Sequence, residues 1–389
     1  MPETRSCNQV YSVELSQLLK EGFSEKFGSY YAKLAEQEKQ ISCYDQKYVQ
    51  WAHSHGFLAE SAYAYELNES NYQNYLSDYD YYRIWPLNNW TKIWINDKLT
   101  LKYMLAGTEY DSFMPKYYYY NTPAGLKKCC DAPNQDVNPT IEEFIQLLSD
   151  CGEFACKPNN GTTSIGFFRA YIDGECVVIN GKHIPFAFVE DELKKYPNYL
   201  FTEFIRPSKE FALYSPSIHT LRLVTLNEAG NTPRIIGGYL RIPNRLSGDA
   251  NYIVLSNHED QYNVFVEVDV DSGVYGNAKL TYIDRVVSTN VHPDSRVELC
   301  GVIPNYEELK ETVLGIAKRF STVEYMGFDI GVTEKGFRCM EINSHPGIKY
   351  MQIFKSLYSD PDTEQYFKGK IAAIEKLTDE LKAKRNSIR

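Results

Sequence analysis

Two carboxylates and one amide within residues 325–347 have a spacing that could bind a metal ion. This segment, YMGFDIGVTEKGFRCMEINSHPG, contains two β-like runs on either side of residues 334–336. A three-residue hairpin loop with glycine in the left-handed conformation fits this spacing and would place Asp329 directly opposite Glu341. Because side chains alternate along a strand, Asn343 lies on the same face as Glu341. The spacing therefore predicts that two carboxylates and an amide oxygen meet on one patch.

Acids that face each other across paired strands repel unless a positive charge lies between them. Mg²⁺ prefers hard oxygen ligands and commonly takes one or two carboxylates together with the phosphates of a substrate. We therefore expect a magnesium site at Asp329, Glu341 and Asn343. A solvated hairpin face with incidental acids is the alternative that these residues leave open.

A second run that could do chemistry is KPNNGTTSIG, residues 157–166, which stands between two predicted strands. A loop rich in Gly, Ser and Thr can cover phosphates with backbone N–H groups and hydroxyls, and Lys157 adds a positive charge. No Gly-Lys-Ser/Thr closes the run and no Gly-x-Gly-x-x-Gly occurs in it, so it is neither a Walker loop nor a kinase loop. A plain flexible hairpin is the alternative.

The composition predicts a folded protein with more than one domain. A length of 389 residues suits two or three domains, and 43% apolar with 24% charged residues is typical of globular proteins. Lys and Arg number 41 against 51 Asp and Glu, a net charge of -10, which argues against a nucleic-acid partner. The nine cysteines include no Cys-x-x-Cys pair, so neither a disulfide framework nor a zinc site is indicated.

The sequence shows neither a secretory signal nor a window of about 18 apolar residues. We therefore expect a cytoplasmic protein without membrane insertion. Residues 1–94 predict a tyrosine-rich helical region, with helices at residues 30–41 and 46–67. The tyrosines at 79–82 and 117–120 could form a stacking platform for sugars or bases, but ordinary packing of helices and domain seams is the favoured interpretation.

After residue 151 the pattern changes to short strands and turns. Asp-Gly, Asn-Gly and Ser-Gly dipeptides at 173, 180 and 272 predict hairpins, and hence antiparallel sheets in an α+β fold. Helices are predicted at residues 99–106, at 141–148 behind a capping box, after Asn305, and at 363–384. The expected strands are residues 154–157, 165–171, 176–179, 199–205, 220–226, 234–242 and 264–270. The expected domains are residues 1–94, 95–150, 151–205 and 206–389.

Together these pieces, over about residues 95–355, resemble the ATP-grasp superfamily. The resemblance implies two α+β lobes whose antiparallel sheets clasp ATP. An Asp-Lys pair, a lysine before a glycine-rich lid loop and a Glu-Phe-Ile hinge follow one another in the family's order, and the segment EINSHPG matches the ligases' Glu-x-Asn-x-x-Pro-Gly. The nucleotide-binding residues implied are Lys98, Lys157, Gly161, Thr162, Thr163, Ser164, Gly166, Glu203, Phe204, Ile205 and Glu210. The metal ligands implied are Asp329, Glu341 and Asn343.

Within the superfamily, the sequence is most similar to the sugar-transfer-associated branch, which is related to the teichuronopeptide-biosynthesis type. Runs that carry this likeness are SIHTLRLVT at 217–225, GYLR at 238–241, HPDS at 292–295 and GFDI at 327–330. D-alanine:D-alanine ligases place an arginine two residues before the first metal acid, where this chain has Gly327. The charge that stabilises the oxyanion must then come from elsewhere. Arg222 and Arg241 are the candidates, with a surface strand position as the alternative for either.

The resemblance implies ATP-dependent joining of a carboxylate to an amine through an acylphosphate, with Mg²⁺, or Mn²⁺ in its place, as the metal. The branch suggests small-molecule substrates, an amino acid or sugar acid of surface-polysaccharide or related biosynthesis. An ATP-grasp phosphotransferase and a nucleotide-binding homologue without turnover are the alternatives. The sequence leaves the oligomeric state open, a homodimer included.

Overall fold

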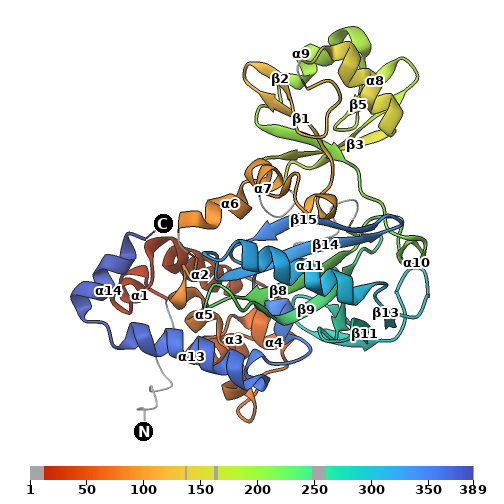
Figure 1. Ribbon diagram of the computed structural model, residues 1–389. Helices are drawn as coiled ribbons and strands as arrows, with labels where there is room; N and C mark the ends of the chain where they lie inside the picture. The colour runs from red at the N-terminus through yellow and green to blue at the C-terminus, as the bar shows by residue number, and fades with distance from the viewer. Residues whose placement is uncertain (1–12, 89, 136–137, 162–164, 248–259, 389) are drawn as a thin grey trace.

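The computed structural model describes residues 13–88, 90–135, 138–161, 165–247 and 260–388. Figure 1 shows a small lobe at the top, a large lobe below it and a helical region at the left. Both lobes are built on antiparallel sheets, as the turn dipeptides predict. No described helix is long and apolar enough to cross a membrane. The cysteines of the described ranges are all free thiols.

The N-terminal region is helical, as predicted, but the helix predicted for residues 46–67 is two helices, separated by a turn at Gly56, which has φ +82°. Its aromatic residues mostly serve packing: Tyr31, Tyr81 and Trp85 are buried in its cores. The elements are α1 (Leu15–Lys20), α2 (Glu25–Glu38), α3 (Gln46–Ser54), α4 (Ala59–Ala64), η1 (Tyr72–Asn74) and α5 (Asp78–Ile84). Four short elements then lead to the small lobe: η2 (Trp90–Lys92), α6 (Ile93–Asn96), α7 (Lys98–Leu105) and η3 (Asp111–Phe113).

The small lobe has a seven-stranded sheet in the order β2-β1-β7-β3-β4-β5-β6. Its strands are β1 (Tyr117–Thr122), β2 (Gly125–Lys128), β3 (Glu153–Pro158), β4 (Phe168–Asp173), β5 (Cys176–Ile179), β6 (Lys182–Pro185) and β7 (Tyr199–Glu203). Its helices are α8 (Ile141–Cys151), η4 (Phe186–Phe188) and α9 (Val189–Leu193). The sheet contains two strands that precede residue 150, β1 and β2, together with the strands that follow it. The domain boundaries given by the sequence remain a prediction.

The capping box predicted for α8 is present: Thr140 Oγ1 accepts from Glu143 N, and the Glu143 carboxylate accepts from Thr140 N, both at 3.2 Å. The tyrosine run at 117–120, treated in the sequence as packing, forms β1, the second strand from one edge of the sheet. Tyr117 and Tyr119 are fully buried there. The strand does not show the usual alternation of apolar and polar residues, because both of its faces are covered. This is why the sequence did not predict a strand here.

The large lobe is an eight-stranded sheet, with seven strands in the order β12-β11-β10-β9-β8-β14-β15 and β13 paired to β11. The strands are β8 (Thr220–Leu226), β9 (Arg234–Ile242), β10 (Asn263–Val268), β11 (Val274–Thr281), β12 (Val286–Thr289), β13 (Gly301–Val302), β14 (Tyr325–Thr333) and β15 (Gly336–Asn343). The helix α11 (Tyr306–Arg319) packs its apolar side, Leu309, Val313 and Ile316, into the core on one face of this sheet. A short helix, α10 (Lys209–Ala212), links the lobes.

Two further helix predictions need correction. The helix expected after Asn305 is present as α11, but Asn305 precedes it in a left-handed conformation, with φ +52°, and its side chain caps no backbone N–H. The single C-terminal helix predicted for residues 363–384 is two helices, α13 (Pro361–Glu375) and α14 (Asp379–Asn386). The break is made by Thr378, whose hydroxyl accepts from Leu381 N and begins a new helix.

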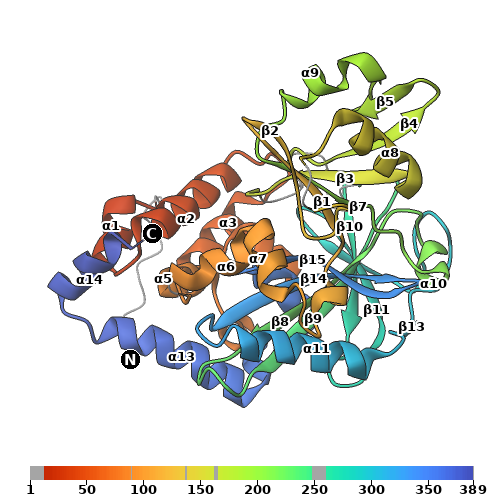
Figure 2. The ribbon, with the colours of Figure 1, turned by 45° about the horizontal axis from the view of Figure 1, so that its top comes forward.

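The N-terminal helices cover part of the face of the large sheet that carries the candidate metal ligands. Val224, Tyr239 and Tyr325 on that face share one core with Phe27 of α2, Tyr81 of α5 and Phe367 of α13. The short α12 (Lys349–Gln352) and η6 (Leu357–Ser359) complete this core. In Figure 2, α6 and α7 cross in front of β14 and β15, between the helical region and the small lobe.

Candidate active site

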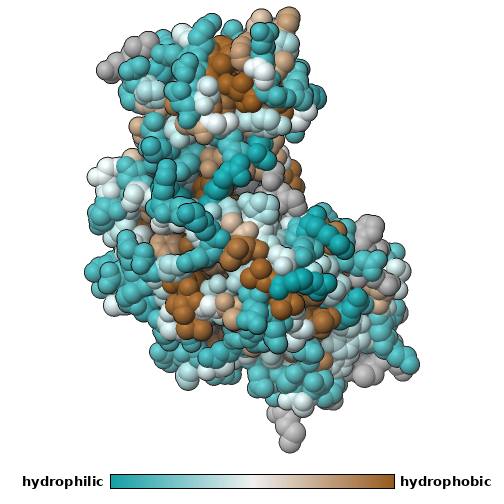
Figure 3. Space-filling model, turned by 90° about the vertical axis from the view of Figure 1, so that its right-hand side faces the viewer, coloured by the Kyte–Doolittle hydropathy of each residue, from teal (hydrophilic) through white to brown (hydrophobic). Residues whose placement is uncertain are grey.

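A cleft lies between the two lobes. Figure 3 shows the small lobe joined to the rest of the molecule across a narrow waist. Among the residues that line the cleft, Ala155, Lys157, Arg169 and Glu203 come from the small lobe, and Thr220, Arg241, Asp329 and Glu341 come from the large one. Lys98, Gly161, Phe204 and Ile205 complete the set of predicted site residues that line it. The fold therefore brings most of the predicted residues together.

The hairpin β14–β15 places Asp329 directly opposite Glu341, as predicted. The reason differs from the one expected. Thr333 pairs with Gly336, so the loop has two residues rather than three, and the register then shifts by one at a β-bulge between Asp329 and Ile330. Met340 is the extra residue of that bulge. Without it, Asp329 would lie opposite Met340 and the two acids would be on different faces of the sheet.

Arg222 on β8 holds the first acid. It lies directly opposite Asp329 in the sheet, and its guanidinium forms two hydrogen bonds to the carboxylate, from Nε at 2.5 Å and from Nη2 at 2.9 Å. Asn343 Nδ2 donates to the same carboxylate at 3.2 Å. Burial by itself lowers the pKa of Arg222, but the carboxylate of Asp329 more than offsets this and the pKa lies above its usual value. Arg222 is therefore a fixed cation beside Asp329.

Lys98 holds the second acid. Its Nζ lies 3.3 Å from Glu341 Oε1 and donates to the carbonyl oxygen of Gly161 at 3.0 Å. It is the first residue of α7 and only 8% of its side chain is exposed. One ammonium group thus joins the large-lobe hairpin to the loop that follows β3.

Lys157, near the end of β3, points toward the same patch. Its Nζ donates to the carbonyl oxygen of Met340 at 3.4 Å and lies 5.7 Å from the centre of the Tyr117 ring. Burial lowers the pKa of Lys157 to about 8, the positive charge of Lys98 adds to this, and Glu341 opposes it. Two lysines held close together are stabilised by an anion, and a triphosphate would supply it.

Asn159 is a site residue that the sequence did not single out. It is buried, its Oδ1 accepts from Leu99 N at 2.9 Å and its Nδ2 donates to Asp97 Oδ2 at 2.7 Å. Asp97 in turn caps α7 through Thr100 N at 2.8 Å. Asn159 therefore locks the N-terminus of the helix that carries Lys98 to the end of β3. Its place two residues after Lys157, in the predicted loop, was the only signal in the sequence.

The other end of the cleft is formed by the hinge of the small lobe. Glu203 accepts a hydrogen bond from Lys116 N at 3.2 Å and lies 3.5 Å from Arg338 Nε. The Phe204 ring lies 5.0 Å from the Arg169 guanidinium and 5.3 Å from that of Arg206. Both arginines form ion pairs with one carboxylate, that of Glu153. These contacts fix the hinge, and neither arginine was predicted.

Some predicted nucleotide contacts fall elsewhere. Glu210 is exposed on α10 and does not line the cleft. The reason is that α10 is anchored to the turn of the hairpin, by Ser208 N to Val332 O at 3.0 Å and by Lys209 N to the Glu334 carboxylate at 2.5 Å, while the acids lie at the other end. Gly166 has φ +82° and its carbonyl accepts from Tyr199 Oη. Thr162, Thr163 and Ser164 lie outside the described residues.

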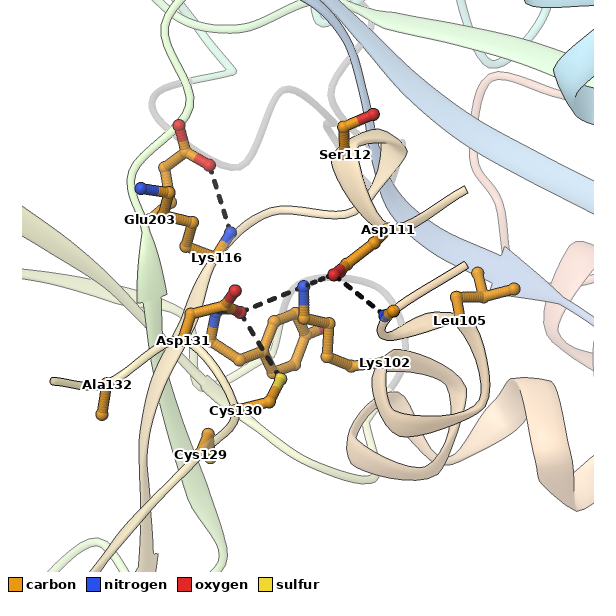
Figure 4. A network of polar contacts seen from close by, with 12 residues as sticks. Lys102, Leu105, Asp111, Ser112, Lys116, Cys129, Cys130, Asp131, Ala132 and Glu203 are labelled. Atoms are coloured by element: carbon orange, nitrogen blue, oxygen red, sulfur yellow. Dashed lines mark hydrogen bonds and ion pairs between the residues drawn. The ribbon is translucent and has the colours of Figure 1, made fainter. Parts of the chain in front are cut away.

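A network of ion pairs and hydrogen bonds around the buried ammonium group of Lys102 connects the helix α7 to the small lobe. Figure 4 shows Lys102 between Asp111 and Asp131, with Nζ–O distances of 2.7 and 3.0 Å. Asp131 also accepts from Tyr117 N at 2.7 Å. The side chain of Lys102 is 2% exposed. The network ties α7, one turn beyond Lys98, to the first strand of the small lobe.

The donor set fits a hard divalent cation. Asp329, Glu341 and Asn343 offer two carboxylates and one amide on one sheet face, which are ligands that Mg²⁺ accepts. No group of three or more His, Cys, Asp or Glu side chains in the described ranges could hold a metal ion by itself. The protein thus provides only part of a coordination shell, and phosphate oxygens are the usual source of the rest.

Two α+β lobes with antiparallel sheets, and a cleft between them lined by lysines and acids, define a protein of the ATP-grasp class. The family model described as sugar-transfer associated ATP-grasp matches residues 132–360, more than half of the chain. The chain belongs to this family, so the resemblance seen in the sequence is confirmed. A comparison with curated proteins gives no match.

Solved structures that resemble this chain are distant. D-alanyl-alanine synthetase A from Vibrio cholerae O1 biovar eltor str. N16961 is 12% identical with a TM-score of 0.37, and the match covers 72% of this chain and 66% of that one. D-alanine–D-alanine ligase from Bacillus anthracis is 14% identical, with a TM-score of 0.35 and coverage of 77% and 72%. L-amino acid ligase from Bacillus licheniformis is 10% identical, with a TM-score of 0.32 and coverage of 67% and 43%. Likenesses this weak carry no argument about activity.

Proposed function

We propose that this protein is an ATP-dependent ligase that joins a carboxylate to an amine. The reaction would pass through an acylphosphate and release ADP and phosphate. The observation that carries the proposal is the convergence of Lys98 and Lys157 with Asp329 and Glu341 on one cleft between the lobes. No protein nucleophile is needed, because phosphoryl transfer depends mainly on positioning and charge stabilisation.

The chain's own residues would divide this work as follows. Lys98 and Lys157 bind the phosphates, Phe204 and Ile205 border the base, and Arg241, which lines the cleft beside Thr220, stabilises the charge that develops on the acid substrate. Asp329, Glu341 and Asn343 would hold Mg²⁺, or Mn²⁺ in its place. The metal would offset the negative charge of the phosphates.

The N-terminal region fixes the loop that follows Asn343. Tyr81 of α5 donates to the carbonyl oxygen of Pro346. Asn88 Nδ2 donates to the carbonyl oxygens of Tyr325 and Ser344, each at 2.7 Å. The loop after the candidate metal ligands Glu341 and Asn343 is thereby held against the helical region.

We propose a surface-polysaccharide or related pathway and a cytoplasmic location. The family description, sugar-transfer associated, supports the first. A cytoplasmic location follows from the need for ATP. The substrates proposed are an amino acid or sugar acid and a small amine.

A screen of carboxylates against amines, with ADP release and product mass as readouts, tests the ligase proposal. The wild-type protein should form ADP only with a matching pair, and Glu341→Gln should abolish turnover while the circular-dichroism spectrum stays unchanged. Release of AMP, or a phosphorylated product without an amine, would instead indicate a phosphotransferase. ATP binding without turnover of any pair would indicate a nucleotide-binding homologue.

A further inference from the structure

We infer that Arg222 and Lys98 close the metal site of this protein until a nucleotide arrives, so that a divalent cation enters only together with ATP. The inference rests on the proposed function, because it concerns the same acids. It adds an order of binding, and it makes Arg222 a positioning residue that acts through Asp329.

The carboxylate of Asp329 has little capacity left for a cation. Oδ1 accepts from Arg222 Nε, and Oδ2 accepts from both Arg222 Nη2 and Asn343 Nδ2. A carboxylate has about four lone-pair sites, so three of them are engaged. Only 13% of the Asp329 side chain is exposed. The amide of Asn343 also presents its nitrogen to Asp329, whereas a metal ligand must present its oxygen.

Glu341 is held in a similar but weaker way. Its Oε1 lies 3.3 Å from Lys98 Nζ, and 28% of its side chain is exposed. A phosphate oxygen can replace this carboxylate as the partner of Lys98, because the ammonium is a compact charge on a flexible stem. The planar Arg222 guanidinium is bound to Asp329 at two points and is harder to displace.

The balance of charge favours the same order. Lys98, Lys157, Arg222 and Arg241 bring four positive charges to this part of the site, and Asp329 and Glu341 bring two negative ones. A free divalent cation would meet a net positive charge in a partly buried cleft, where repulsion is weakly screened. A triphosphate reverses the sign, and the cation can then bind between phosphates and acids.

Titration of Mn²⁺ monitored by electron paramagnetic resonance tests this order directly, because free and bound Mn²⁺ give different signals. We expect the wild-type protein without nucleotide to bind Mn²⁺ only weakly, and the Mn²⁺ affinity to rise when a non-hydrolysable ATP analogue is present. Arg222→Gln should raise the affinity for Mn²⁺ in the absence of nucleotide by about tenfold or more, since one full charge next to Asp329 is removed.

Arg241→Gln is the matched control. It removes the same charge from the same sheet face, but Arg241 lies opposite Thr220 rather than an acid, so the Mn²⁺ affinity should rise less than in Arg222→Gln. Lys98→Met supplies a second measurement if Arg222→Gln does not fold, and it should raise the nucleotide-free affinity through Glu341.

Nucleotide-free Mn²⁺ binding that is equally tight in the wild type, Arg222→Gln and Lys98→Met would overturn the inference and leave the ligase proposal intact. Absence of Mn²⁺ binding in the presence of the ATP analogue would instead remove the metal site on which both depend. The two failures are therefore distinguishable.

Discussion

Gly327 and Pro346 pack so closely that a methyl group on Gly327 would lie 2.5 Å from Cβ of Pro346. The same methyl group would lie 3.3 Å from Nη1 of Arg222. The space beside residue 327 is thus filled by a proline ring and by a guanidinium from the neighbouring strand. Any side chain larger than hydrogen at this position would meet the ring of Pro346.

Substitution of Gly327 should damage both the fold and the site. In Gly327→Ala the new methyl group meets Pro346, whose carbonyl oxygen is held by Tyr81, so the loop cannot move away freely. We expect a loss of about 1–3 kcal/mol in the free energy of unfolding, measured with urea, and a fall in ADP release. Gly347→Ala is the control, since nothing lies within 4 Å of its added methyl group. Equal stability of the two variants would contradict this account.

The parts of the site that follow from local patterns were predictable. The ATP-grasp order of the Asp-Lys pair, the lysine before the loop and the acid hairpin predicts Lys98, Lys157 and Glu341 in one cleft, and all three line it. The strands β8 and β9 have the predicted bounds, because each is a β-rich run that ends at turn residues.

The parts that depend on contacts between distant segments were not predictable. The bulge at Met340, the contact of Asn159 with Asp97 and the pairing of Arg222 with Asp329 join residues that are adjacent only in the folded chain. Glu210 illustrates the converse. The resemblance placed it among the nucleotide-binding residues, but the anchor of α10 on Val332 keeps it outside the cleft. The spacing of residues along the sequence does not reveal tertiary contacts of this kind.

Replacement of Asn159 should weaken ATP binding through Lys98. Asn159→Asp keeps the acceptor for Leu99 N but loses the donor to Asp97 and places two carboxylates side by side. The start of α7 should then shift, and the KM for ATP should rise about tenfold or more while kcat changes less, since an unpaired buried charge costs more than 1 kcal/mol. Steady-state kinetics measure this split. Asn180→Asp, the same change at an exposed hairpin turn, should leave both constants unchanged.

Removal of the Lys102 charge should destabilise the junction between α7 and the small lobe. Lys102→Met leaves Asp111 and Asp131 without their common partner, and we expect a loss of about 2 kcal/mol in the free energy of unfolding. Chemical denaturation measures it. The control is Lys194→Met, which breaks an exposed pair with Asp191 on the helix α9 and should not move the midpoint. A midpoint unchanged in both variants would show that the network adds nothing to stability.

ATP affinity should fall as the pH rises above about 8 because of Lys157. Burial and then the charge of Lys98 lower the pKa of Lys157 to about 8 in the nucleotide-free protein, and Glu341 and Cys339 oppose this only in part. Phosphates next to the ammonium favour its charged form, so they raise this pKa on binding. Above the nucleotide-free pKa, ATP binding must therefore take up a proton, and the dissociation constant should rise by up to about tenfold per pH unit.

Calorimetry of ATP-analogue binding in two buffers of different ionisation enthalpy, near pH 8.5, counts this proton. The wild type should take up a substantial fraction of one proton. Lys157→Arg is the control, because a guanidinium stays charged across this range, so the uptake and the fall in affinity should both disappear. If Lys157→Arg kept the same proton uptake, another group would titrate on binding and Lys157 would not face the phosphates.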